Sequence, residues 1–292
     1  MKILITGGSG FIGRNLFEYL SKRYDCFAPL HRELELLDEN AVMHFLKTNR
    51  FDVIIHSAGI PVSRKIKEPK DVAFGNLKMF FNIARNKDHF SKMIFLGSGS
   101  EYDLRREISK IKESDFDKNV PADELGFSKY VCSKEIEKSD KMINLRLFGV
   151  FGKYEDYQIR FISNAICKAV CGLPITIKQN RCFSYLYIDD LCKITEYFIN
   201  RHAGHKIYNA VPNGTADLLS IAKKVNELSK KNLEIIVHTP GLAKEYTADN
   251  SLLVSEIGDF QFTPLEEAIK KLYSWYEENK KNIDPGLLAY DP

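Results

Sequence analysis

Met1-Lys-Ile-Leu-Ile-Thr-Gly-Gly-Ser-Gly-Phe-Ile-Gly13 is the stretch that decides the fold. The apolar run from Lys2 to Thr6 predicts a short strand, and the spacing Gly7-x-x-Gly10-x-x-Gly13 predicts a tight turn that opens a helix. Glycine lets the backbone bend sharply and approach a ligand closely, and the first N–H groups of a helix suit a pyrophosphate. This order favours a dinucleotide-binding βαβ unit over an ordinary glycine-rich βα turn that binds nothing.

The residues that follow alternate between strand and helix patterns. We expect strands at 26–30, 53–57 and 92–96, and helices at 38–49, 71–86 and 126–140. This alternation predicts an α/β fold, a Rossmann-like doubly wound parallel sheet with a small C-terminal substrate-binding lobe. We expect a dinucleotide-binding domain at 1–150 and mainly the lobe at 151–292, interleaved with returning Rossmann elements at about 183–211. Ligands should bind where the parallel strands end.

Composition excludes several classes of protein. The 292 residues are 44% hydrophobic and 28% charged, and 42 basic against 39 acidic residues leave a formal net charge of only +3. This balance does not point to nucleic acid, and no apolar run is long enough to span a membrane. The first strand begins at the first residue, so we expect a cytoplasmic protein without a signal peptide. The six cysteines and seven histidines lack metal-ligand spacing, so we expect no metal and reduced thiols.

The end of the second expected strand bears on the choice of dinucleotide. An acidic side chain usually holds the ribose 2′-hydroxyl of NAD at this point, but the chain reads Leu30-His31-Arg32. A basic pair can neutralise a 2′-phosphate, so NADP is favoured, with NAD still possible. Residues 35–36 and the turn Ser57-Ala58-Gly59 would line the same groove.

A helical segment further along carries a candidate catalytic pair. Tyr130 and Lys134 are four residues apart, so they share a helical face. A nearby ammonium can lower the phenol pKa of about 10 by up to roughly three units, which would let Tyr130 exchange a proton near neutral pH. Such a pair also occurs by chance, but Ser98 follows a strand and could complete a site.

The chain resembles the extended short-chain dehydrogenase/reductase superfamily, which includes nucleotide-sugar epimerases, dehydratases and ketoreductases. It is most similar to GDP-fucose synthases and 4-keto-deoxysugar reductases. The matching motifs occur in family order: Thr6-Gly-Gly-Ser-Gly-Phe-Ile-Gly13, His56-Ser-Ala-Gly59, Asn76, Phe95-Leu-Gly-Ser98 with Tyr102, Tyr130-x-x-x-Lys134, Arg146-Leu-Phe-Gly-Val-Phe-Gly152 and Tyr187-Ile-Asp-Asp190.

The resemblance implies roles for particular residues. Ser98, Tyr130 and Lys134 would be catalytic, and the last two would also contact the cofactor. The other expected cofactor contacts, including those read from the residues alone, are Gly7, Gly10, Phe11, Ile12, Gly13, His31, Arg32, Glu35, Leu36, Ser57, Ala58, Gly59, Asn76, Leu147, Phe148 and Val150. Ser98, Ser100, Gly149, Arg181 and Tyr185 are the expected contacts of a nucleoside-diphosphate sugar.

In relatives, the helices at 71–86 and 126–140 pair with their copies, so we expect a homodimer. Its apolar surface would come from Phe74, Leu77, Phe80, Phe81 and Ile83, which could equally only cover the sheet.

Departures from the family pattern narrow the expected reaction. Gly99-Ser100 replaces the Asp-Glu pair of the dehydratases, so we do not expect elimination of water. Ser100 also replaces the epimerising cysteine of GDP-fucose synthase, and a hydroxyl is a poor base for inversion. We therefore expect NADPH-dependent reduction of a nucleoside-diphosphate 4-keto-6-deoxy sugar. The alternatives are a 4-epimerase or dehydrogenase with retained NAD, and a non-catalytic NADP-sensing protein.

Overall fold

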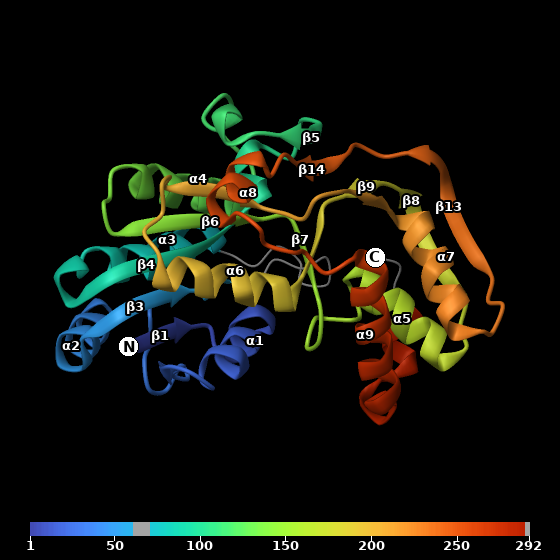
Figure 1. Ribbon diagram of the computed structural model, residues 1–292, viewed down its shortest axis with the longest axis horizontal. Helices are drawn as coiled ribbons and strands as arrows, with labels where there is room; N and C mark the ends of the chain where they lie inside the picture. The colour runs from blue at the N-terminus through green and yellow to red at the C-terminus, as the bar shows by residue number, and fades with distance from the viewer. Residues whose placement is uncertain (61–70, 290–292) are drawn as a thin grey trace.

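The computed structural model describes residues 1–60 and 71–289, and its centre is a six-stranded sheet in the order β11-β6-β4-β3-β1-β2 (Figure 1). Every pairing in this sheet is parallel, as the alternation of strands and helices predicts. The carboxyl ends of β1, β3 and β4 therefore meet at one edge. The strands are β1 (Lys2–Thr6), β2 (Asp25–Phe27), β3 (Phe51–His56), β4 (Phe90–Ser98), β6 (Met142–Leu147) and β11 (Ile207–Ala210).

Helices cover both faces of this sheet because successive strand residues point to opposite sides. Ile3 and Ile5 pack under α1 (Phe11–Leu20) and α6 (Ile188–Asn200). Leu4 packs on the other face, under α2, α3 and α4. These three helices run over Glu39–Asn49, Val72–Ala84 and Glu124–Glu137. The main sheet thus has two separate apolar layers, which makes it a doubly wound fold.

A smaller lobe has its own apolar core. It is built from α5 (Phe161–Cys171), α7 (Leu218–Ser229) and α9 (Leu265–Glu278), and Figure 1 shows it beside the main sheet. The parallel pair β8 (Ile175–Asn180) and β13 (Ile235–Leu242) packs on these helices. The short helix α8 (Ser251–Ile257) contacts β11 and so returns the chain to the main sheet.

Two small sheets lie between the lobe and the main sheet. β7 (Gly149–Phe151) pairs with β10 (Tyr185–Tyr187), and a second sheet has the order β12-β9-β14-β5. Its strands are β5 (Ile108–Ile111), β9 (Cys182–Phe183), β12 (Ala216–Asp217) and β14 (Tyr246–Ala248). The remaining short 3-10 turns are η1 (Lys87–His89), η2 (Gly99–Tyr102), η3 (Glu113–Asp115), η4 (Lys280–Asn282) and η5 (Pro285–Ala289). The second sheet brings β14 toward the end of β4.

Two expectations change with the structure. The second strand ends at Phe27 rather than at residue 30, because Pro29 has no N–H to donate to a neighbouring strand. Phe80 and Ile83 are fully buried under the sheet, whereas Phe74 is 65% exposed. The homodimer stays a prediction that now depends mainly on Phe74. Within residues 1–60 and 71–289, no helix is both long and apolar enough to cross a bilayer.

Candidate active site

The turn between β1 and α1 is a cradle that only glycine can form. Gly7 has a φ of +71°, and a Cβ on Gly13 would lie 2.2 Å from the Gly7 carbonyl oxygen. A Cβ on Gly7 would lie 2.8 Å from the backbone of Ala58. Among the described residues, no side chain caps the start of α1. The first N–H groups of the helix, which include those of Phe11 and Ile12, therefore have no competing side-chain acceptor. These features fit a pyrophosphate group at this turn.

The loop after β2 is open at its basic residues. His31 and Arg32 are exposed, and His31 Nδ1 lies 3.2 Å from a Glu35 carboxylate oxygen. The backbone N–H of Leu37 donates to Glu35, and this bond lowers the pKa of the carboxyl group. The Leu36 side chain is only 6% exposed and belongs to the core below α2 and α3. The Leu36 side chain therefore packs in the core, and the expected contact of residues 35–36 with the cofactor stays a prediction.

A buried hydrogen-bond chain fixes the end of β3. The Thr6 hydroxyl accepts the N–H of Ala58 at 3.3 Å and is hydrogen-bonded to His56 Nδ1 at 2.8 Å. Burial lowers the pKa of His56 to about 3, so the ring stays neutral. Asn76 accepts the N–H of Ile60 at 2.8 Å. These bonds hold the loop after β3, which contains Ser57 and Gly59, against the glycine turn.

The turn at the end of β4 presents hydroxyl groups. The Ser98 hydroxyl oxygen accepts from the Ser100 N–H at 3.1 Å and from the Ser100 hydroxyl at 2.9 Å. The Ser98 N–H donates to Glu101 at 2.9 Å, which completes a capping box around η2. The two serines predicted to face the substrate therefore lie together at the carboxyl edge of the sheet.

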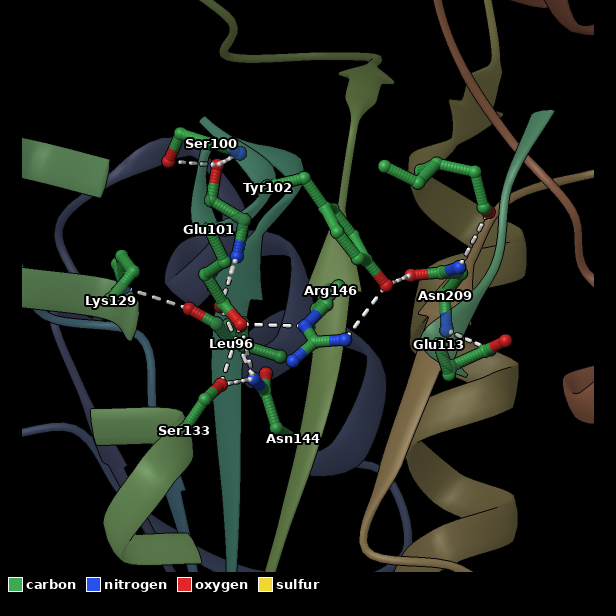
Figure 2. Close-up of polar contacts among 12 residues, drawn as sticks. Leu96, Ser100, Glu101, Tyr102, Glu113, Lys129, Ser133, Asn144, Arg146 and Asn209 are labelled. Atoms are coloured by element: carbon green, nitrogen blue, oxygen red, sulfur yellow. Dashed lines mark hydrogen bonds and ion pairs between the residues drawn. The ribbon is translucent and has the colours of Figure 1, made fainter. Parts of the chain in front are cut away.

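A buried ion pair lies beneath this turn (Figure 2). The Glu101 carboxylate and the Arg146 guanidinium are 2.6 Å apart, and both side chains are 0% exposed. Ser133 donates to the same carboxylate at 2.5 Å. Arg146 also donates to the Tyr102 hydroxyl at 2.7 Å, and that hydroxyl donates to Asn209 at 2.7 Å. Glu101 is fully paired, so its role is to hold the turn rather than to act as a base.

The structure does not bring Tyr130 and Lys134 to this turn. The Tyr130 hydroxyl donates to Asp117, and its ring packs on Phe116 with centroids 5.2 Å apart. The bond to the Asp117 carboxylate raises the pKa of Tyr130, which is the opposite of the predicted effect. The Lys134 ammonium lies 3.0 Å from Asp117 and 2.8 Å from Glu137. The expectation that these two residues share the site with Ser98 is therefore wrong.

Lys129 is the cation that the structure does place at the site. Its ammonium donates to the carbonyl oxygen of Leu96 at 2.8 Å and lies 4.4 Å from the centroid of the Phe95 ring. Figure 2 shows it directed from α4 toward the end of β4. Burial lowers the pKa of Lys129. A signal for Lys129 was present in the helix pattern. Lys129 lies on the same helical face as the buried positions Cys132, Ser133 and Ile136.

The same face of α4 lacks the expected phenol. In the expected Tyr-x-x-x-Lys pattern, the tyrosine lies one helical turn before the lysine. For Lys129 that position is residue 125, which is a leucine. Leu125 carries no proton that it could exchange. The site therefore has a serine hydroxyl and a lysine ammonium, but no phenol from this helix.

Aromatic and basic side chains lie next to the Ser98 turn, where substrate contacts are expected. Phe148 packs on Tyr246 with ring centroids 5.0 Å apart, and the Arg181 guanidinium lies 5.6 Å from the Tyr246 centroid. A Cβ on Gly149 would lie 2.9 Å from the Tyr185 ring. Leu147 is buried and Val150 half-buried beside this group. Tyr246 was missed in the sequence because its strand has only three residues.

Tyr185 also lines a separate cavity of about 260 Å³. Its other walls come from segments near α6 and the start of α9, including Asn213 and Phe262. Among the described residues, no cluster of three potential metal ligands is present.

Relatives of the chain are enzymes that modify nucleotide sugars. GDP-L-colitose synthase of Yersinia pseudotuberculosis is 22% identical over 97% of this chain and all of its own length. A GDP-mannoheptose C4 reductase from Campylobacter jejuni, solved with NADP bound, superposes with a TM-score of 0.80 at 20% identity over 94% of this chain and 98% of its own. A UDP-glucose 4-epimerase from Thermotoga maritima, solved with UDP-glucose, superposes with a TM-score of 0.82 at 18% identity. The superposition covers 96% of this chain and 100% of the epimerase.

These solved structures confirm the predicted fold. The model of the NAD dependent epimerase/dehydratase family matches residues 3–210, which span the glycine cradle, the Ser98 turn and α4. The resemblance read from the sequence is thereby confirmed. The chain belongs to the NAD dependent epimerase/dehydratase family and is a nucleotide-sugar-modifying enzyme of that family.

Proposed function

We propose that the chain reduces the keto group of a nucleoside-diphosphate 4-keto-6-deoxy sugar with NADPH. The observation that carries this proposal is that the turn after β4 offers hydroxyl groups and no base. Glu101, its only carboxylate, is bound to Arg146. The thiol of Cys132 is buried in α4, and burial raises its pKa to about 12. Elimination or inversion beside the ketone would need a base at this place, whereas reduction needs only a hydride and a proton.

The residues of the groove suit the parts of a nicotinamide dinucleotide. The glycine cradle would hold the diphosphate, and Arg32 would pair with a 2′-phosphate. Lys129 has two further N–H donors beyond its bond to Leu96, and these would bind ribose hydroxyls. The bound nicotinamide would supply the hydride. Ser98 would bond the sugar oxygen and stabilise it as its charge changes.

Relatives support a GDP-linked substrate. GDP-L-colitose synthase and the GDP-6-deoxy-D-talose 4-dehydrogenase of Aggregatibacter actinomycetemcomitans, which is 23% identical over 94% of this chain, are both named for GDP-linked deoxysugars. Arg181 and Tyr185 would contact the substrate in the lobe-side half of the site. We therefore expect the GDP-linked 4-keto sugar to be a better substrate than its CDP-, dTDP- and UDP-linked forms.

A screen of ketosugars tests this function. The purified chain is mixed with GDP-, CDP-, dTDP- or UDP-linked 4-keto-6-deoxy sugars and either NADPH or NADH, and dinucleotide absorbance is followed. We expect one NADPH to be consumed for each sugar reduced. Arg32→Ala should raise the KM for NADPH by about tenfold and leave that for NADH nearly unchanged, because only NADPH carries the 2′-phosphate. Turnover of a nucleotide sugar with no net NADPH consumption would instead support a 4-epimerase.

A second candidate function is binding of NADP without catalysis. The observation that favours it is Leu125, which leaves the catalytic face of α4 without a phenol. Tight binding of NADP together with no turnover of any ketosugar in the screen would support this alternative and contradict the reductase.

A further inference from the structure

Reduction of a ketone needs a proton donor, and this inference rests on the proposed reductase function. The carbonyl carbon receives a hydride, so the oxygen must receive a proton. Leu125 cannot give one, and Tyr130 is bonded to Asp117 away from the Ser98 turn. Another donor must therefore reach the turn.

Tyr246 reaches the turn from a distant part of the chain. Its strand, β14, pairs with β5 and β9, so a sheet holds its backbone in place. A Cβ on Gly99 would lie 2.6 Å from the Tyr246 hydroxyl and 2.6 Å from the Phe148 ring. The phenol thus lies directly over the turn, and it can do so because residue 99 has no side chain.

Ser98 and Tyr246 place two hydroxyl groups at this turn. The Ser98 oxygen accepts two hydrogen bonds from Ser100, so its own proton is available to a third partner. The Ser98 side chain also interacts with the Tyr246 hydroxyl, and this interaction lowers the phenol pKa. A keto oxygen bound at this turn would lie within reach of both hydroxyl groups.

The surroundings keep Tyr246 protonated and near a cation. Burial raises the pKa of Tyr246, while the interaction with Ser98 and the charge of Arg181 act in the opposite direction. The Arg181 guanidinium lies 5.6 Å from the Tyr246 ring centroid and 5.0 Å from that of Phe183. The Arg181 guanidinium would stabilise a phenolate that forms briefly during turnover.

We propose that Tyr246 is the proton donor of the reduction, in place of a phenol on α4. The O–H bond of Tyr246 breaks as the keto oxygen takes its proton, while the carbonyl carbon takes the hydride from reduced nicotinamide. The products are the sugar alcohol, the oxidised dinucleotide and a Tyr246 phenolate, which recovers its proton from water. Ser98 holds the phenol and the keto oxygen in place.

Tyr246→Phe tests this role and keeps the ring packing. We expect kcat to fall at least about 100-fold with little change in the dissociation constant of NADP. Tyr130→Phe is the matched control and should keep normal turnover. Leu125→Tyr added to Tyr246→Phe should restore part of the lost rate, because it puts a phenol one helical turn from Lys129.

A binding measurement separates donation from packing. Calorimetry in the presence of NADP compares a GDP-linked 6-deoxy sugar that carries a 4-hydroxyl with its 4-deoxy analogue. The wild type should prefer the hydroxylated sugar, and Tyr246→Phe should reduce this preference by about tenfold because one hydrogen bond is lost.

The outcomes are distinct. Normal turnover by Tyr246→Phe overturns the role of Tyr246 and leaves the reductase function standing. A lower rate with an unchanged 4-hydroxyl preference makes Tyr246 a packing residue and also overturns the donor role. If the wild type oxidises no NADPH with any ketosugar, the reductase function fails, and the donor role fails with it.

Discussion

Glu155 is a single acidic residue whose environment sets a pH dependence for the whole chain. Its side chain lies beside α5, where it is 7% exposed, and it accepts a hydrogen bond from the Ser163 hydroxyl at 2.6 Å. Burial raises the pKa of Glu155 from 4.5 to about 8. The folded protein therefore keeps a proton on Glu155 at neutral pH, whereas the unfolded chain releases it.

This difference predicts how stability changes with pH. Between about pH 5 and pH 8 the folded state binds more protons at this site, so its contribution to the free energy of unfolding falls as pH rises. Glu155→Gln keeps an acceptor for Ser163 and removes the titration. As pH rises across this range, we expect the free energy of unfolding of the variant to increase relative to that of the wild type. The difference should change by at least about 1 kcal/mol by the upper end of the range. Urea unfolding at several pH values checks this, and two parallel pH curves would contradict it.

At the residue scale, the sequence predicted the turn residues well and the helix residues poorly. The glycines of the cradle and Ser98 are where short-range rules place them, because turn geometry depends on neighbouring residues. The spacing Tyr130-x-x-x-Lys134 predicted Lys134 as the cation of the site, because spacing along the chain does not tell which face of the helix is directed to the site. Adjacent helical residues point about 100° apart, so Lys129 faces the site while Tyr130 does not.

At the scale of elements, the ion pair between Glu101 and Arg146 joins η2 to β6, and the Ser133 hydroxyl joins α4 to the same carboxylate. Both groups are fully buried, and the carboxylate also receives the Ser98 N–H. Neither charge could stay buried alone without a large desolvation cost. This ion pair therefore links the stability of the sheet edge to the position of the Ser98 hydroxyl.

Arg146→Met should destabilise the protein strongly. The change leaves Glu101 as an unpaired buried carboxylate, which costs about 3–5 kcal/mol of unfolding free energy. Lys206→Met breaks an exposed pair with Asp140, so as a control it should cost less than about 1 kcal/mol. Chemical denaturation of both variants checks this. Equal losses in the two variants would show that the buried pair has no special role.

Long elements were predictable and short ones were not. Most strands of the main sheet and the helices that cover it have apolar patterns that extend over several residues, and these patterns predicted them, although β6 was not among the expected strands. β5 and β14 have only four and three residues, and each is a strand because a distant segment pairs with it. The sequence alone does not report such a pairing, so Tyr246 did not enter the expected site.

At the scale of the whole molecule, the site combines elements from both ends of the chain. We propose that the glycine cradle, the loop after β3, the Ser98 turn and α4 form the dinucleotide half, and these segments lie within residues 3–210 matched by the family model. The proposed substrate half adds Arg181, Tyr185 and Tyr246 from the segments between the main sheet and the lobe. Of these three residues, only Tyr246 lies outside the matched range.

The central claim is that this groove binds a nicotinamide dinucleotide with Lys129 as its cation. Calorimetric titration of NADP into the wild type, Lys129→Met and Lys134→Met tests it most directly. We predict that Lys129→Met weakens binding by at least about tenfold, while Lys134→Met binds like the wild type. Weaker binding in Lys134→Met with normal binding in Lys129→Met would contradict the claim.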